Sequence, residues 1–414
     1  MYRKPKIIFV GDYGREDYVC LLKAAKDYCD FIFLFYTTPN EEENTFYQSF
    51  GKAIYWENYD SAQQLIEKVS PDKVVFLYIE SYNHIVLNLA CKAASTPTYL
   101  LEHGLRADYI FGFDPEISPG KEQSLKRRIR YYYQLARDFK SRIRSRQFLN
   151  NSLALLSADD RAFTKDFIEV RGRHNYLGTF RAIKSEKRFA DYYIGFSTKI
   201  YEAYKGHEAA YFGGQVKLIG IPYFDRLANL PSASVTKSVL LIDQPLAEQG
   251  LLQWNEEHKK AFAAGLSGIC KKHGYTLYIK PHPKQDIKIW QKLKQEQNCR
   301  IIDDAELAEL APSIPVVIGF YSTYLMPFAA FPHTTVLTYE NHPAGEYLVS
   351  KPLVDAGVAN AFFDLKELDR LLPNIEELHQ KQLPQKVIFT KEWMFEFDGK
   401  AGERLRDILL GKKP

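Results

Sequence analysis

The chain has 414 residues, of which 46% are hydrophobic and 26% are charged, and its formal net charge is only +4. This length exceeds a single hydrophobic core and predicts two domains of about 150–220 residues each. The small net charge excludes a protein that binds polyanions over its whole surface. Five scattered cysteines without CxxC spacing exclude a disulfide framework and a zinc site, and they predict reduced thiols in the cytoplasm. The first apolar run is too short for a signal peptide, and no run approaches about 18 apolar residues, so we expect no membrane span.

The first half of the chain alternates short apolar runs with segments of helical spacing. Strands are expected over Lys6–Gly11, Asp30–Tyr36, Ala53–Trp56, Lys73–Ile79, Thr96–Leu101, Leu153–Ser157, Tyr192–Phe196 and Val216–Pro222. Helices are expected over Arg15–Tyr28, Ser61–Val69, His84–Ala94 and Asp159–Val170. Continuous apolar strands between helices indicate a parallel sheet that is covered on both faces.

The second half repeats this pattern after a polar segment, Asn229–Ser238, which predicts a linker. Its expected strands are Val239–Asp243, Thr276–Lys280, Arg300–Asp303, Val316–Phe320, Thr335–Tyr339 and Phe362–Leu365. Its expected helices are His258–His273, Lys284–Gln297, Ala305–Ala311 and one that begins over Leu325–Ala330. The predicted organisation is therefore two α/β domains, residues 1–230 and 238–390, followed by an amphipathic C-terminal helix over 391–414.

The basicity of the chain is concentrated in one stretch, Lys121–Arg146, which has helical composition. It contains ten Lys or Arg and two acids, a local balance of +8 against +4 for the whole chain. Aromatic residues are interleaved with these charges, so Arg127, Arg128 and Arg130 are candidates for contact with an anionic membrane or an acidic glycan acceptor. A solvated helix is the simpler alternative. Nucleic acid is not expected as a partner, because no nucleic-acid-binding motif accompanies the stretch.

A histidine between two prolines follows the strand that ends at Lys280. Pro281 and Pro283 fix their backbone angles and cannot continue the strand, so His282 lies in a rigid turn at the carboxyl end of that strand. Ligands bind at this end of the strands in open α/β sheets. His282 can donate to a phosphate oxygen there, with support from the amino terminus of the following helix. The alternative is an exposed histidine in a proline-rich connection.

Other groups suited to chemistry also follow predicted strands. Gly319–Thr323 (GFYST) places two hydroxyls at a helix start, where they can bind a phosphate or simply cap the helix. Gln244 follows a strand as well. Glu102 and His103 precede Gly104, and either can serve as a general base if the turn is more than a polar turn at the sheet edge.

The ordered set of these motifs resembles the signatures of bacterial polysialyltransferases and lipooligosaccharide sialyltransferases. Those families have an acidic pair before glycine, a His-Pro pair and a Ser/Thr pair. The matching residues here are Glu102-His103-Gly104 with Tyr109, Lys280–Pro283 and Gly319–Thr323. Gln244-Pro245-Leu246 and Gly220–Asp225 add to the likeness, which extends over roughly residues 96–340.

The resemblance implies a GT-B fold, in which two Rossmann-like domains face a central cleft and a C-terminal helix crosses back. It implies inverting transfer of a nonulosonic sugar (sialic acid, or Kdo) from a CMP donor to a capsule or lipooligosaccharide glycan, in the cytoplasm and with peripheral contact to the membrane. Glu102 would be the general base and His282 would bind the CMP phosphate. The other donor-binding residues would be Gln244, Lys280, Pro283, Gly319, Ser322 and Thr323.

We expect no metal ion or other cofactor, because the single phosphate of CMP can be stabilised by a histidine and backbone amides, and the chain has no DxD motif. His103 departs from the family pattern, where a second acid is usual, so the base is either Glu102 or His103. The His-Gly and His-Pro turns also resemble those of CDP-glycerol phosphotransferases. A glycerol- or ribitol-phosphate transferase and a non-catalytic nucleotide-sugar or glycan binder are therefore the alternatives.

Overall fold

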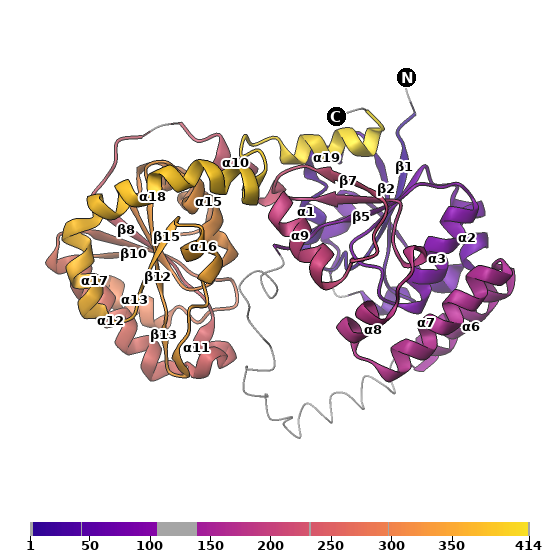
Figure 1. Cartoon of the computed structure of the whole chain (residues 1–414), viewed down its shortest axis with the longest axis horizontal. Coiled ribbons are helices and arrows are strands. Elements are labelled where there is room, and N and C mark those ends of the chain that lie inside the picture. The colour runs from indigo at the N-terminus through magenta and orange to yellow at the C-terminus, as the bar shows by residue number, and fades with distance from the viewer. Residues whose placement is uncertain (1–2, 43, 106–138, 232, 297, 413–414) are drawn as a thin grey trace. The chain divides into compact units, whose positions relative to one another are not determined.

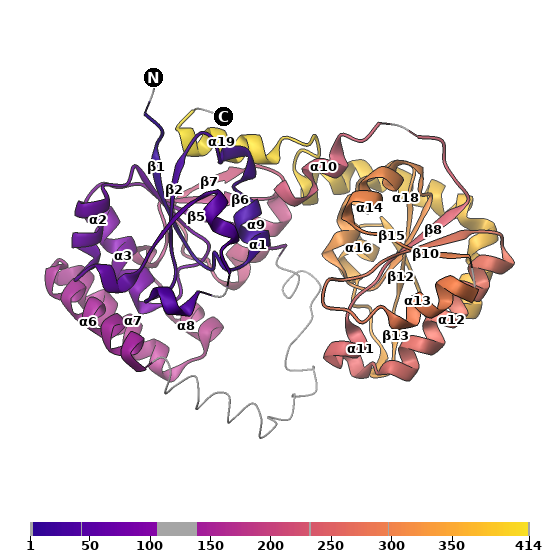
Figure 2. The ribbon, with the colours of Figure 1, turned by 180° about the vertical axis from the view of Figure 1, so that it is seen from behind.

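The computed structural model describes residues 3–42, 44–105, 139–231, 233–296 and 298–412, and the chain folds into two compact units. Of the described residues, the first unit contains 3–104, 139–223 and 400–412, and the second contains Leu105 and 224–399. Each unit is built on a parallel sheet with helices on both faces (Figures 1 and 2). The predicted α/β class with two Rossmann-like sheets is confirmed. Among the residues described, no helix combines the length and hydropathy that a membrane span requires.

The first sheet has seven parallel strands in the order β3-β2-β1-β4-β5-β6-β7. The strands are β1 (Lys6–Val10), β2 (Asp30–Leu34), β3 (Gly51–Ile54), β4 (Lys73–Phe76), β5 (Thr98–Leu101), β6 (Tyr192–Gly195) and β7 (Gln215–Leu218). The central strand β1 reads KIIFV, and its last four residues are fully buried. Side chains on both faces of this strand therefore need cover, as the continuous apolar run predicts.

Helices supply that cover in the first unit. They are α1 (Glu16–Cys20), α2 (Ala62–Val69), α3 (Tyr82–Ala93), α6 (Phe139–Leu155), α7 (Ala158–Arg173), α8 (Tyr176–Ala182) and α9 (Thr198–His207). Helices α2, α3, α6 and α7 lie on one side of the sheet, and α1 and α9 on the other (Figure 1). Serine N-caps begin several of them: Ser61 and Ser81 accept from backbone N–H groups in the first turns of α2 and α3.

The second sheet has six parallel strands in the order β10-β9-β8-β11-β12-β15. They are β8 (Ser238–Ile242), β9 (Thr276–Lys280), β10 (Cys299–Ile301), β11 (Val316–Gly319), β12 (Thr335–Tyr339) and β15 (Ala359–Phe362), with a separate hairpin of β13 (Asn341–His342) and β14 (Gly345–Glu346). The helices of this unit are α10 (Asp225–Ala228), α11 (Leu246–Gln249), α12 (Glu256–Lys272), α13 (Lys288–Glu296), α14 (Asp304–Leu310), α15 (Met326–Ala330), α16 (Lys351–Asp355), α17 (Leu365–Leu371) and α18 (Ile375–Phe389).

Two expected strands are wrong in type or position. Leu153–Ser157 is not a strand: its first residues end α6, and Ser157 caps α7 by accepting from the backbone N–H of Asp160. A run of four apolar residues is compatible with a helix that packs on a sheet as well as with a strand. The strand expected over Phe362–Leu365 lies earlier, in β15, because Asp364 caps α17 and begins a helix there.

Helix α19 (Ala401–Leu410) is observed within the predicted C-terminal helix and returns to the first unit. It packs on the 3₁₀ turn Lys23–Ala25, and Leu405 and Leu409 are fully buried. Arg404 donates to the carbonyl of Ile219 in the same unit at 3.1 Å. The predicted return of the chain to its first domain is therefore confirmed. The segment 106–138, with Tyr109, Arg127, Arg128 and Arg130, lies outside the described residues.

Candidate active site

Three neighbouring strands of the second sheet end together and bring the predicted donor motifs to one edge. Ile242 at the end of β8 pairs with Lys280 of β9 on one side and with Gly319 of β11 on the other. The residues that follow these strands are therefore adjacent in space, although they are up to about 80 positions apart in the sequence. This carboxyl edge is where parallel α/β sheets bind ligands.

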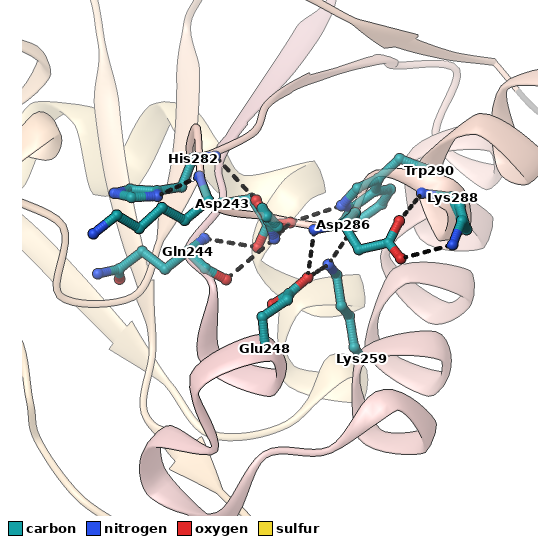
Figure 3. Close-up of polar contacts among 10 residues, drawn as sticks. Asp243, Gln244, Glu248, Lys259, His282, Asp286, Lys288 and Trp290 are labelled. Atoms are coloured by element: carbon teal, nitrogen blue, oxygen red, sulfur yellow. Dashed lines mark hydrogen bonds and ion pairs between the residues drawn. The ribbon is translucent and has the colours of Figure 1, made fainter. Parts of the chain in front are cut away.

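The His282 turn has a defined hydrogen-bond pattern. The backbone N–H of Lys284 donates to His282 Nδ1 at 3.1 Å, and the His282 N–H donates to Gln285 Oε1 at 3.0 Å (Figure 3). The pKa of His282 is lowered by loss of hydration and by the charges of Lys284 and Lys280, so the neutral ring is favoured. Because Nδ1 accepts a hydrogen bond, the neutral ring carries its proton on Nε2. His282 therefore presents an N–H donor on an exposed ring.

The buried carboxylate of Asp243 supports the His282 turn through hydrogen bonds. Its Oδ1 accepts from the Gln244 N–H at 2.9 Å, and its Oδ2 accepts from Trp290 Nε1 at 2.6 Å and from Gln285 Nε2 (Figure 3). Burial raises the pKa of Asp243 to about 6, against the opposing effects of the Lys259 charge and these donors. Asp243 is thus connected to His282 through one side chain, Gln285.

A second contact fixes the far end of the same turn. Glu248 Oε1 accepts from the Asp286 N–H at 2.9 Å and pairs with Lys259 Nζ at 2.5 Å. Lys259 Nζ also donates to the Asp286 carbonyl at 2.8 Å, and Lys259 is only 6% exposed (Figure 3). Helix α13 begins at Lys288, two residues after Asp286, and not at Lys284, where the predicted helix began. Its amino terminus is still close to His282 in the sequence.

Gln244 and Lys280 extend the network toward the Gly319–Thr323 loop. Gln244 Oε1 accepts from the backbone N–H of Tyr321 at 3.0 Å. Lys280 Nζ pairs with Asp304 Oδ1 at 3.1 Å and donates to the Pro281 carbonyl at 3.2 Å. Gln244 therefore joins the end of β8 to the Gly319–Thr323 loop, whereas Lys280 is paired with Asp304.

The hydroxyl pair lies at a short helical turn. Ser322 Oγ accepts from the Tyr324 N–H at 3.2 Å and caps the 3₁₀ turn Thr323–Leu325, which leads into the five-residue helix α15. Helix capping is thus one role of Ser322. Its oxygen accepts in this contact, so its O–H remains able to donate to another group. Gly319 is required by packing, because a Cβ there would lie 2.8 Å from a methyl of Leu325.

In the first unit, Glu102 follows β5 and is only 1% exposed. Its Oε2 accepts from Tyr193 Oη at 2.5 Å, and its Oε1 accepts from the N–H groups of His103 and Gly104 at 3.1 and 3.2 Å. Three donors therefore converge on this carboxylate.

His103 is half-buried among aromatic rings of the same unit. Its ring lies edge-on to Tyr18, with centroids 4.9 Å apart, and 6.0 Å from Tyr78. Its carbonyl accepts from Tyr223 Oη at 3.0 Å. Glu102 and His103 are therefore held in one fixed turn, with the carboxylate turned inward and the imidazole flanked by phenols.

Comparison with known proteins identifies the family. The family model for alpha-2,8-polysialyltransferase matches residues 6–341. The chain belongs to this family. It is therefore a glycosyltransferase of the sialyltransferase type that uses a CMP-activated sugar, and the resemblance seen in its motifs is confirmed.

Solved structures agree on the fold of this polysialyltransferase-family chain. A variant of the wall teichoic acid polymerase TagF is similar, with a TM-score of 0.51 and 13% identity over 99% of this chain and 88% of that chain. LpCGTa in complex with UDP is similar with a TM-score of 0.50 and 13% identity, over 99% of both chains. These likenesses show the GT-B fold. No curated protein matches the sequence.

Several residues of the hydrogen-bond network at the carboxyl edge of the second sheet were not predicted from the sequence. They are Asp243, Glu248, Lys259, Gln285 and Trp290. Only Asp243 carried a signal, as an acid at the end of an apolar strand. In the part of the chain that the structure describes, no three His, Cys, Asp or Glu side chains gather as metal ligands would.

Proposed function

We propose that this polysialyltransferase-family chain transfers a sialic-acid-type sugar, with inversion and without a metal ion, to a capsule or lipooligosaccharide glycan. The observation that supports it best is the fixed proton on His282 Nε2. This donor lies at the same sheet edge as Ser322 and Thr323, which suits a site for the single phosphate of a CMP donor.

The donor half of the reaction uses these groups directly. When the bond between the anomeric carbon and the phosphate oxygen breaks, its electron pair goes to that oxygen, and negative charge grows on the phosphate. His282 Nε2–H and the hydroxyls of Ser322 and Thr323 bind this charge, and their hydrogen bonds strengthen in the transition state. His282 stays neutral, because its Nδ1 accepts from the Lys284 N–H, and it acts on the departing CMP as a hydrogen-bond donor through Nε2–H.

The acceptor half uses Glu102 as the general base, and because its carboxylate is buried, the acceptor hydroxyl can reach it only when the Glu102–Gly104 turn opens. It takes the proton of the acceptor hydroxyl as the acceptor oxygen attacks the anomeric carbon from the face opposite to CMP, which inverts that centre. The hydrogen bond from Tyr193 and those from two backbone N–H groups fix the orientation of the Glu102 carboxylate. Family membership supports a sialyl acceptor, and we assign contact with this acidic glycan, or with the membrane that carries it, to Arg127, Arg128 and Arg130.

The reaction is tested by CMP release from CMP-sialic acid, CMP-Kdo and CDP-glycerol, each with and without a sialylated acceptor. We expect acceptor-dependent release from CMP-sialic acid that survives EDTA, and a product whose anomeric configuration by NMR is opposite to that of the donor. Release from CDP-glycerol alone would replace this proposal by phosphotransfer. Loss of activity with EDTA that returns with Mg²⁺ would refute metal independence.

The residue roles are tested by substitution. Glu102→Gln is expected to abolish transfer with little change in CMP affinity by calorimetry, whereas the exposed control Glu67→Gln is expected to keep wild-type rates. If His103→Ala is inactive while Glu102→Gln is active, His103 is the base. His282→Ala is expected to weaken CMP binding and lower turnover, and His258→Ala on the exposed side of α12 serves as its control.

A further inference from the structure

The carboxylate of Asp243 has no part in the proposed transfer, yet it is buried beneath the exposed His282 turn. It is 7% exposed, directly after the last residue of β8. All its hydrogen-bond partners are N–H groups: the backbone of Gln244, the indole of Trp290 and the side-chain amide of Gln285 (Figure 3). Burial of a carboxylate costs free energy, and these three donors offset part of that cost. Such an arrangement suggests that Asp243 has a specific role.

The charge of Asp243 determines which way the Gln285 amide faces. An ionised carboxylate only accepts hydrogen bonds, so Gln285 must turn its Nε2 toward Asp243. That orientation places Gln285 Oε1 on the opposite side, where it accepts from the His282 N–H at 3.0 Å. Gln285 Nε2 also donates to the Gln244 carbonyl at 3.1 Å, and the Gln285 N–H donates to the His282 carbonyl at 3.0 Å. The ionised carboxylate thereby fixes the backbone on both sides of the His282 peptide.

Protonation of Asp243 would weaken this arrangement. Its Oδ2 accepts from two N–H groups, of Trp290 and Gln285, and its Oδ1 accepts from a third, of Gln244. Hydrogen bonds to an ionised acceptor are stronger than those to a neutral one, so loss of the charge loosens all three contacts that hold the turn.

The charged groups around Asp243 favour that state. Lys259 of α12 attracts the negative charge, and Glu248 of α11, which pairs with Lys259, partly offsets it. The other titratable groups of the turn are His282, Lys284 and Asp286, and Lys280 precedes it. Because burial raises the pKa of Asp243 to about 6, loss of the ionised form falls in a pH range that an enzyme assay can reach.

We infer that Asp243 and Gln285 are positioning residues for sugar transfer, and that together they hold the His282 turn so that its Nε2–H is presented to the donor phosphate. Neither residue touches the substrate. The inference rests on the proposed role of His282, and it adds that the orientation of this histidine depends on a buried negative charge at the end of the neighbouring strand, β8.

The main test is a double-mutant cycle with His282. Gln285→Met keeps the length of the side chain and removes both of its polar contacts, and the exposed Gln291→Met on α13 is the matched control. We expect Gln285→Met to lower kcat for CMP-sialic acid by about 10- to 100-fold, as misplacement of a catalytic group does. In the His282→Ala background, Gln285→Met is expected to cause no further loss, because both changes remove the same contribution.

The second readout is the pH profile of kcat, which a merely structural role would leave unchanged. The acid limb of the wild type is expected near pH 6, with activity falling as Asp243 is protonated. Trp290→Phe removes one donor to Asp243 while keeping an aromatic ring in the core, so the ionised form is disfavoured and the limb moves to higher pH. Thermal unfolding of each variant checks that it is folded.

The possible failures are distinguishable. If His282→Ala turns over like the wild type, the proposed phosphate role of His282 is wrong and the positioning role falls with it. If His282→Ala is impaired but Gln285→Met is not, only the positioning role is wrong. The positioning role alone is also wrong if the losses of the two single variants multiply in the double variant, or if Trp290→Phe leaves the acid limb in place.

Discussion

Lys386 allows a quantitative test of how a buried charge affects the stability of the second unit. Its amine is buried, and in the described part of the chain only one hydrogen bond offsets its loss of hydration. It lies on α18 and is 2% exposed, and its Nζ donates to the Ala329 carbonyl near the end of α15 at 3.1 Å. Burial lowers the pKa of Lys386 from 10.5 to about 7. Among the described residues no carboxylate pairs with it, so its charged form is opposed by desolvation alone.

The energetic consequence follows from linkage. At about 1.4 kcal/mol per pKa unit, the difference between 10.5 and about 7 corresponds to about 5 kcal/mol that opposes folding at low pH. Between these two values the unfolded chain binds one more proton than the native state, so this contribution to stability rises with pH. Lys386→Met removes it, and the lost hydrogen bond with the bare carbonyl costs about 2 kcal/mol. The variant should therefore be more stable than the wild type by about 2–3 kcal/mol at pH 7.

Urea unfolding at pH 7 and pH 9 measures this difference, with the exposed Lys381→Met on the same helix as the matched control. The advantage of Lys386→Met should narrow by about 2 kcal/mol at pH 9, because the wild type gains stability there and the variant does not. Lys381→Met should show neither effect. A Lys386→Met variant that is less stable than the wild type by the same amount at both pH values would refute the reasoning.

Other features give simpler expectations. Ser350→Ala should lower the stability of the second unit by about 2 kcal/mol in urea unfolding, because the Ser350 hydroxyl donates to the Phe320 carbonyl at 2.6 Å and contacts the buried Glu340. Leu405→Ala should cost the first unit about 2–5 kcal/mol, since Leu405 is fully buried in α19. Replacement of both Arg127 and Arg128 by Glu should reduce sedimentation with anionic vesicles, and unchanged sedimentation would leave the basic stretch a solvated helix.

The sequence predicted which residues follow β8, β9 and β11 at the carboxyl edge of the second sheet, because the interactions that form these strands are local. Short runs rich in apolar residues, SVLLI and TLYIK, identify β8 and β9, and parallel pairing then brings the residues after them together. The network beneath His282 was not predictable in this way. It depends on which way the amide of Gln285 faces, and a turn has no side-chain periodicity that would reveal it.

The predictions of two helix starts were wrong for a different reason. Leu153–Ser157 was assigned as a strand on its apolar residues, although Ser157 followed by Asp159 and Asp160 is a helix start signal. The same holds for Asp364, which begins α17 at the end of an expected strand. In both cases a capping side chain decided the structure, and a short apolar run by itself did not.

Gln244 hydrogen-bonds to two segments that are predicted to bind the donor phosphate. Its side-chain oxygen accepts from the Tyr321 N–H, and its backbone carbonyl accepts from Gln285 Nε2, so one residue hydrogen-bonds to both the Gly319–Thr323 loop and the His282 turn. A phosphate bound between these segments would meet donors that are already ordered, and little free energy would be lost in arranging them. The role of Gln244 in donor binding therefore need not involve contact with the nucleotide, because it fixes the distance between the two segments that would hold the phosphate.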